Sequence, residues 1–295
     1  MGSAASPEIA AFPGGYAAWR ERKLAAYPRR AEELIVEVRD PRELSAAESE
    51  AIAERVRRAN MAVYAGRSGS DPDRDLPRVL ARQFGLHRID PNWLADDDGI
   101  SSIRVRDGAP RGEFIPYTSR AIRWHTDGYY NPPERRIRAF VLHCVRAAAE
   151  GGETMLLDHE IAYLMLRDAN PAWAQALMRP GAMTIPARHA EDGSVRGAQS
   201  GPVFSFDTAD ASLHMRYTAR ATNIVWAPDP DTRAAVRFFA EQLGDDTASA
   251  LRLRLEPGMG VICNNVLHTR SAFRDDPAAP RLLYRARYYD RIARA

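Results

Sequence analysis

The first hundred residues alternate between short apolar runs and stretches with helical periodicity. In residues 31–41, AEELIVEVRDP, polar and apolar positions alternate, which predicts a strand. In the following LSAAESEAIAERVRRANM, apolar residues recur at helical spacing, and Ser45 stands where an N-cap is expected. We predict a second strand for AVYAG, a loop for RSGSDPDRDLP, and short helices for LPRVLARQFGL and for the segment from Tyr16 to Ala26.

Beyond residue 100 the chain changes to short β runs separated by turn residues. The runs are GISSIRVR, RAIRWHTDG, RIRAFVLHCVR, GETMLLD, PVFSFD, HMRYT, NIVWAP, MGVICNNVLHTR and RLLYRARYY. Two helical patterns interrupt them, DHEIAYLMLRDANPAWAQALM and DPDTRAAVRFFAEQLGDD, the second with Asp229 or Asp231 as its cap. Many short strands with few helices favour a mainly β fold with peripheral helices, most simply a jelly roll. We expect residues 1–30 to be an N-terminal extension and residues 31–295 to form a single domain.

Composition and charge narrow the range of partners. The 295 residues are 45% apolar and 27% charged, as in ordinary globular proteins. Lys+Arg 41 against Asp+Glu 39 is too balanced to indicate a nucleic-acid surface, so we expect a small-molecule substrate. The sequence has no G-x-G-x-x-G after a predicted strand and no P-loop, which gives nucleotide-binding folds no support.

The expected location follows from cysteine usage and from the absence of targeting patterns. Cys144 and Cys263 both stand inside apolar runs, where buried thiols are common, and no disulfide framework is readable. The N-terminal MGSAASPEIAAFPGG lacks the features of a signal peptide, and no stretch approaches the length of a membrane span. These patterns predict a cytoplasmic protein without a membrane partner.

The segment WHTDGYYNPP places His125 and Asp127 two positions apart next to apolar residues. On a strand, residues i and i+2 project from the same face, so the imidazole and the carboxylate would enter one space. The pair is then either hydrogen-bonded or two thirds of a metal site, and H-x-D alone does not decide between them. His268, in VICNNVLHTR, offers a third ligand. Two histidines and one carboxylate form the facial triad of non-haem Fe(II) oxygenases.

Further motifs occur in an order that resembles a known family. AAEGGETMLLD and NNVLHTRSAFRDDPAAPRLLYRARYYD follow the H-x-D segment. In this combination, over roughly residues 32–290, the chain resembles the TauD/TfdA-like Fe(II)- and 2-oxoglutarate-dependent dioxygenases. Its tail is most similar to the glutarate hydroxylase branch, and more weakly to γ-butyrobetaine hydroxylases.

The resemblance implies a fold, a cofactor set and a reaction. The fold is a double-stranded β-helix, or jelly roll. His125, Asp127 and His268 would bind Fe(II), and 2-oxoglutarate and O₂ would be cosubstrates. A C–H bond of the substrate would be hydroxylated while succinate and CO₂ are released. The family pattern assigns the distal carboxylate of 2-oxoglutarate to Thr154 and Arg281. Many relatives are homo-oligomers, so the resemblance allows for one here.

The final predicted strand suggests how a substrate is held. Arg281, Arg285 and Arg287 share one face of RLLYRARYY, and guanidinium groups match carboxylate geometry. Because Arg285 lies about 13 Å along the strand from Arg281, a second anion, a carboxylate or sulfonate of the substrate, is the simpler use for it. Arg287 and Tyr130 are further candidates for the substrate. The alternatives are a solvated arginine face, or a pairing of Arg285 with an acid such as Asp290.

Other classes of function remain open at this level. A jelly-roll binding protein without activity would retain the metal site, and a metal-dependent hydrolase would use the same ligands. The hydrolase needs an additional general base, and we identify none. Asp127 argues against the related halogenases, in which a small residue replaces this carboxylate. A γ-butyrobetaine-type hydroxylase of a zwitterionic substrate is a further alternative.

Overall fold

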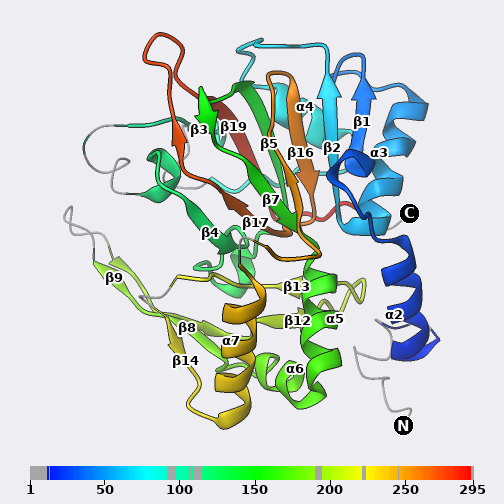
Figure 1. The fold of residues 1–295 in the computed structure, drawn as a ribbon, viewed down its shortest axis with the longest axis vertical. Helices are drawn as coiled ribbons and strands as arrows, with labels where there is room; N and C mark the ends of the chain where they lie inside the picture. Colours follow the sequence, from blue (N-terminus) through cyan, green and yellow to red (C-terminus); the bar gives the residue numbers. More distant parts are fainter. Residues whose placement is uncertain are drawn as a thin grey trace.

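Two β-sheets form the centre of the molecule in a computed structural model (Figure 1). The structure describes residues 12, 14–91, 98–106, 108, 114–189, 195–220, 224–244 and 246–293. The larger sheet has the order β1-β2-β16-β5-β19-β3. These strands are Ile35–Val38, Met61–Gly66, Met259–Cys263, Ala139–Arg146, Leu282–Tyr288 and Ser101–Ile103. Only β1 and β2 pair in parallel, and the remaining neighbours are antiparallel.

The second sheet carries most of the predicted site and packs against the first. Its order is β15-β7-β17-β4, with the bounds Leu251–Leu253, Thr154–Leu157, Leu267–Arg270 and Ile122–His125. Phe140, Val261 and Leu283 of the larger sheet share one buried cluster with Leu156 and Leu253 of the second. This dry layer holds the two sheets face to face. The expected mainly β fold with peripheral helices is therefore confirmed as one mixed and one antiparallel sheet, and the described strands form no closed barrel.

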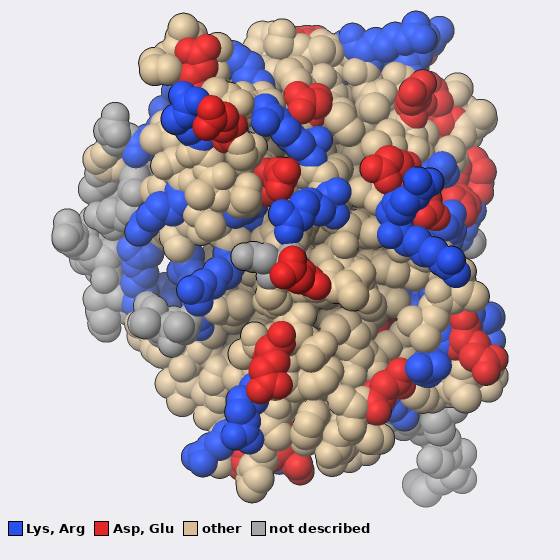
Figure 2. Space-filling model, in the orientation of Figure 1, with Lys and Arg blue, Asp and Glu red and all other residues tan. Residues whose placement is uncertain are grey.

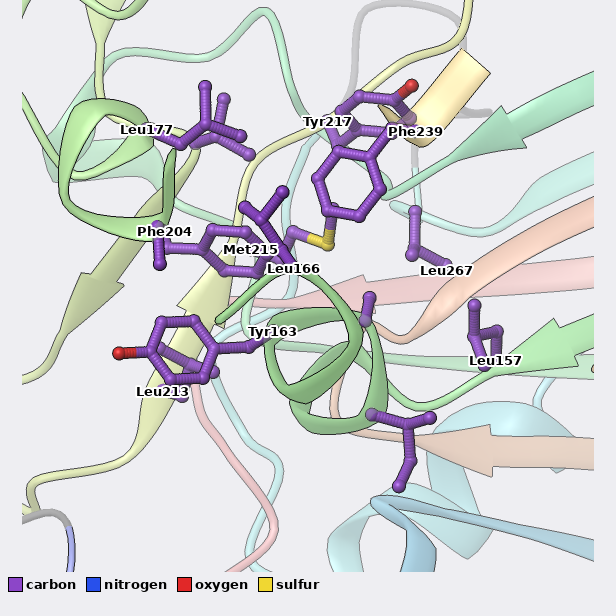
Figure 3. Packing of buried hydrophobic residues seen from close by; sticks show 14 of the residues in the cluster. Leu157, Tyr163, Leu166, Leu177, Phe204, Leu213, Met215, Tyr217, Phe239 and Leu267 are labelled. Carbon is purple, nitrogen blue, oxygen red and sulfur yellow. The ribbon is translucent and has the colours of Figure 1, made fainter. Parts of the chain in front are cut away.

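A helical layer and several short strands complete the lower half of the view. The helices are α5 His159–Ala169, α6 Pro171–Leu177 and α7 Pro230–Gln242. The strands are β8 Met183–Ile185, β11 Gln199–Gly201, β12 Phe204–Phe206, β13 Leu213–Met215 and β14 Val225–Trp226. Figure 3 shows Tyr163 of α5, Phe204 of β12 and Phe239 of α7 pointing into one apolar cluster. Leu157 and Leu267 extend this cluster to the second sheet.

Three helices near the N-terminus lie against these layers. They are α2 Gly15–Ala26, α3 Ala46–Ala59 and α4 Leu76–Arg82. As predicted, Ser45 caps α3, and it forms a reciprocal capping box with Glu48. In α2, Lys23 is buried and forms ion pairs with Asp158 and Glu160. The division into residues 1–30 and 31–295 stays a prediction.

Two predicted elements are interrupted. The helical pattern beginning at residue 158 divides into α5 and α6, because Pro171 lacks the N–H that would continue the first helix. The run MGVICNNVLHTR divides into β16 and β17, which belong to different sheets. Asn265 lies at the break with φ 51°, a left-handed conformation that ends a strand and that asparagine tolerates. Periodicity alone could not reveal this turn.

Short segments finish the framework. The described 3₁₀ turns are Ala31–Leu34, Ile115–Tyr117 and Pro133–Arg135. Two small two-stranded sheets pair β6 Glu150–Gly151 with β18 Phe273–Arg274, and β9 Arg188–His189 with β10 Val195–Arg196.

Figure 2 shows side chains of both charges interspersed over one face, with basic groups gathered around a hollow near β4 and β9. No helix in the described part of the chain is long and apolar enough to span a membrane.

Candidate metal and cosubstrate site

The two predicted histidine ligands face each other across adjacent strands. His125 is the last residue of β4, and the antiparallel register pairs it directly with His268 of β17. Directly opposed side chains lie on the same side of a sheet, and the two imidazole centroids are 4.1 Å apart. The pairing of β4 with β17 thus brings together two residues that are remote in sequence.

Asp127 lies just beyond the end of β4 and is held by a side chain from another strand connection. The amide of Asn265 accepts a hydrogen bond from the Asp127 N–H at 2.8 Å and donates to the Asp127 carbonyl oxygen at 3.0 Å. It also donates to the carbonyl oxygen of Ile137 at 2.8 Å. Asn265 was not among the residues predicted for the site, and its only signal is an Asn-Asn pair inside an apolar run.

Backbone carbonyls fix the orientation of both imidazoles. Nδ1 of His125 lies 2.9 Å from the carbonyl oxygen of Arg123, and Nδ1 of His268 lies 3.0 Å from that of Val266. Because a carbonyl oxygen only accepts, each Nδ1 carries the proton and each Nε2 keeps its lone pair. This is the tautomer that a metal-binding histidine needs. Burial, with the facing His268, lowers the pKa of His125 to about 3, and burial also lowers the pKa of His268.

The Asp127 carboxylate is buried and paired with an arginine. Arg285 donates from Nη1 to Oδ1 at 3.0 Å, and the side chains of both residues are almost fully buried. Burial would raise the pKa of Asp127, but the positive charges of Arg285 and Arg287 outweigh it and hold that pKa at about 2. The carboxylate is therefore ionised at neutral pH, next to two neutral imidazoles.

These three side chains fit a divalent metal. Ligand atoms from His125, Asp127 and His268 lie within 4.8 Å of one another. Oδ2 of Asp127 is buried and has no hydrogen-bond partner, which is costly unless a cation binds it. Two neutral nitrogens and one carboxylate oxygen are the donor set of a facial triad for Fe(II). The role of each as a ligand remains a proposal.

A cavity beside the histidines contains the residues expected to hold 2-oxoglutarate. Thr154 of β7 and Arg281, just before β19, line this cavity together with His125 and His268. Arg281 is 5% exposed, burial lowers its pKa to about 10, and its Nη1 has no hydrogen-bond partner. A buried guanidinium with an unsatisfied donor suits one carboxylate of a dicarboxylic acid.

The packing around Arg281 depends on glycine and phenylalanine. The Arg281 guanidinium lies 5.0 Å from the ring centroid of Phe273. A Cβ at Gly152 would come within 3.4 Å of Nε of Arg281, and one at Gly151 within 2.2 Å of the Ala272 carbonyl oxygen. Both glycines also have positive φ, so the Gly-Gly of AAEGGETMLLD is needed for backbone geometry and for close approach.

Arg270 is a further residue of this cavity that sequence reasoning missed. Its guanidinium donates to the carbonyl oxygens of Pro116 and Thr118 at 3.1 and 2.6 Å. Burial, then the charge of Arg281, lowers its pKa to about 9. Arg270 thus anchors the segment that covers one side of the cavity. The sequence signal for Arg270 is its position two residues after His268 on a strand, which puts both side chains on one face.

The remaining predicted substrate residues form a buried polar network. Arg287 makes an ion pair with Asp90, and its Nη1 donates to the hydroxyl of Tyr130 at 3.0 Å. Asp90 also accepts from Tyr289 at 2.6 Å. Asp290, considered as a partner for Arg285, instead pairs with Arg88. The substrate roles of Arg285, Arg287 and Tyr130 stay predictions, and each of the three already has a partner within the protein.

Comparison with known families decides the family of this chain. The model of the taurine catabolism dioxygenase TauD, TfdA family matches residues 22–287. The chain belongs to this family. The resemblance inferred from the motifs is thereby confirmed, and with it the class of Fe(II)- and 2-oxoglutarate-dependent oxygenases.

Individual relatives give a narrower view. The chain is 35% identical over 175 residues to a uridine-5'-phosphate dioxygenase from Amycolatopsis, and this match covers 56% of this chain and 60% of the relative. It is 30% identical over 197 residues to a uridine-5'-phosphate dioxygenase from Streptomyces, and that match covers 65% of this chain and 69% of the relative. The match to the first relative thus spans less than two thirds of its length.

A solved structure supports the fold. An asparagine oxygenase in complex with Fe(II), 3-hydroxyasparagine and succinate superposes with a TM-score of 0.56 at 16% identity. The match covers 91% of this chain and 89% of the asparagine oxygenase. At this identity the likeness concerns the fold alone.

Proposed function

We propose that this protein is an Fe(II)- and 2-oxoglutarate-dependent dioxygenase that oxidises a phosphorylated pyrimidine nucleoside of the uridine-5'-phosphate type. The observation that carries the reaction class is the convergence of His125, Asp127 and His268, with Oδ2 of Asp127 buried and unpartnered. The two sheets packed face to face would correspond to the expected jelly roll. With iron bound, the cosubstrates would supply an oxidant for a C–H bond, and succinate and CO₂ would be released.

The relatives change the expected substrate but not its charge. The sequence alone favoured a carboxylate or sulfonate, whereas the two related dioxygenases are named for a phosphate ester. A phosphate ester also carries negative charge, which fits the basic groups around the hollow near β4 and β9 (Figure 2). The proposed substrate class is therefore a nucleoside monophosphate.

Different residues of the cavity would bind the metal and bind 2-oxoglutarate. The two Nε2 atoms and Oδ2 of Asp127 would hold the metal, and the Nδ1–H···O=C bonds would keep both imidazole planes fixed. Arg281 would donate to the distal carboxylate of 2-oxoglutarate and Thr154 would supply a hydroxyl to it. Ile103, Phe140 and Leu142 line the same cavity, and these apolar side chains would limit the access of water.

Succinate release provides the direct test of reaction class and substrate. The protein with Fe(II), 2-oxoglutarate and O₂ is incubated with uridine-5'-phosphate, uridine, taurine or glutarate, and succinate is quantified with each. We expect release above the substrate-free background with uridine-5'-phosphate. Release that is greatest with taurine or glutarate would return the assignment to a carboxylate or sulfonate substrate.

Variants of the three ligands separate the metal site from the rest of the fold. His125→Ala, Asp127→Ala and His268→Ala should each lose most of the bound iron and all succinate release, because three ligands are the minimum for this site. Glu153→Ala, a half-exposed change next to Thr154 that removes no proposed ligand, is the matched control. Unchanged iron content in all three ligand variants would contradict the assignment.

A further inference from the structure

Arginines cluster around two tyrosines that follow the proposed metal ligand Asp127. Tyr129 and Tyr130 lie edge to face, with ring centroids 5.2 Å apart. The guanidinium of Arg196 lies 5.6 Å from the Tyr130 ring centroid and its Nη1 is 3.4 Å from the Tyr130 carbonyl oxygen. Because Tyr130 also bonds to Arg287, this cluster adjoins the buried network around the metal site.

A second arginine follows the segment that pairs with the end of β4. His125 forms an antiparallel bridge with Thr218, and the Ala219 N–H donates to the Trp124 carbonyl oxygen at 2.8 Å. Extended residues two apart project from the same face, so Arg220 falls on the side of Thr218 and His125. Arg220 therefore follows the histidine ligand toward the rim.

Among the residues that the structure describes, no carboxylate lies within ion-pair distance of Arg123, Arg196 or Arg220. Arg123 and Arg220 are exposed and Arg196 is half-buried. Guanidinium groups that lie near one another repel each other. A bound anion would remove that repulsion.

The charges of Arg196 and Arg220 both act on one phenol, that of Tyr129. Burial raises the pKa of Tyr129, and the charges of Arg220 and Arg196 act against this rise. Burial also lowers the pKa of Arg196, whose guanidinium donates to the carbonyl oxygens of Tyr130 and Pro186. Figure 2 shows basic groups around a hollow beside β4 and β9. Two guanidiniums from different segments thus act on the charge of the Tyr129 phenol.

We propose that Arg196 and Arg220 bind the phosphate group of a nucleoside monophosphate, with Tyr129 beside it as a hydroxyl donor. The inference rests on the proposed function and assigns the phosphate subsite within it. A phosphate dianion accepts hydrogen bonds from two guanidiniums at once, whereas one carboxylate is satisfied by a single bidentate arginine. The aromatic faces of Tyr129 and Tyr130 next to it suit a planar base.

Equilibrium binding tests the subsite without relying on turnover. Uridine-5'-phosphate, uridine and inorganic phosphate are titrated calorimetrically into the wild-type protein and into Arg196→Gln and Arg220→Gln. We expect uridine-5'-phosphate to bind at least about 10-fold more tightly than uridine, and each variant to weaken nucleotide binding about 10-fold. Uridine binding should be unchanged, and Arg196→Lys and Arg220→Lys should restore part of the affinity. Arg237→Gln, an exposed arginine of α7, is the control and should behave as wild type.

The outcomes distinguish the subsite from the proposed reaction. Equal affinity for uridine and its monophosphate, or unchanged phosphate binding in both Gln variants, overturns the subsite. If uridine-5'-phosphate binding depends on Arg220, the phosphate subsite is supported. If the same protein releases no succinate with uridine-5'-phosphate, the proposed substrate is contradicted while the subsite stands. Each variant is compared with wild type by its thermal unfolding midpoint, so that a folding defect is recognised.

Discussion

Arg285 binds Oδ1 of Asp127 through Nη1 at 3.0 Å and leaves Oδ2 of the same carboxylate buried without a partner. The pair is buried and joins β19 of the larger sheet to the segment after β4 of the second. This contact orients one oxygen and frees the other, which is the arrangement of a monodentate metal ligand held by an outer partner. It also occupies the guanidinium that the sequence assigned to a substrate anion.

Replacing Arg285 should weaken metal binding more than substrate binding. In Arg285→Gln the Asp127 carboxylate loses its charge-assisted partner, and loss of such a partner costs about 10- to 100-fold in metal affinity. The affinity for Fe(II), or for Mn(II) as an air-stable probe, is measured by competition with a chromophoric chelator. Wild-type metal affinity together with a raised Michaelis constant for the substrate would show that Arg285 serves the substrate instead.

Removing Arg281 should affect 2-oxoglutarate selectively. Its Nη1 is buried and unsatisfied, so the cosubstrate carboxylate would be its partner. Arg281→Met should raise the Michaelis constant for 2-oxoglutarate roughly 10- to 100-fold, and Thr154→Val should raise it less, because a neutral hydroxyl contributes less than a charged group. Arg274→Met, which breaks an exposed pair with Glu150, serves as control. An unchanged constant in Arg281→Met would move this role to another arginine.

Asn265 should contribute to stability through both its side chain and its backbone. Asn265→Gly loses three side-chain hydrogen bonds, one accepted and two donated, and should lower the free energy of unfolding by about 2 kcal/mol or more. Asn265→Ala should cost roughly 1 kcal/mol more than Asn265→Gly, because alanine is disfavoured at φ 51°. Urea unfolding measures both differences. If the alanine variant were the more stable, the left-handed turn would not be what constrains this position.

Acid should destabilise the metal-free protein through buried histidines outside the metal site. Burial lowers the pKa of His143 and of His159 to about 4 each, from a usual value of 6.5. Below pH 6.5 the unfolded chain therefore binds more protons than the folded one, and stability is lost as pH falls from about 6.5 toward about 4. Each histidine should cost roughly 2 kcal/mol between pH 6.5 and pH 5.

The contribution of His159 can be isolated. His159→Gln keeps a donor for the carbonyl oxygen of Leu213, which Nε2 of the histidine contacts at 2.9 Å, and removes the titration. Urea unfolding at pH 7.5 and pH 5.0 should show a smaller loss of stability in this variant than in wild type. His87→Gln, at an exposed position, should retain the wild-type dependence. Equal pH dependence in His159→Gln and wild type would rule out this source.

Local signals were sufficient for most elements. The capping residues Ser45 and Asp229 mark helices that form as expected, because the stabilising contacts lie within one helical turn. Alternation in RLLYRARYY correctly separated the apolar face, with Tyr284 and Tyr288 in a buried cluster, from the face carrying Arg281 and Arg285. The motif order was specific enough to indicate the family, since the reaction needs its residue types in fixed places along the fold.

Only the tertiary structure decided which of these side chains meet. His125 faces His268 because β4 and β17 pair in one register, and Arg285 reaches Asp127 because the two sheets pack face to face. The Asn265 turn, which splits one apolar run between the two sheets, gave no periodic signal. Likewise Arg196 approaches the ring of Tyr130 from a separate segment. Such contacts depend on strand register and sheet packing between distant residues, and a sequence read locally carries no measure of either.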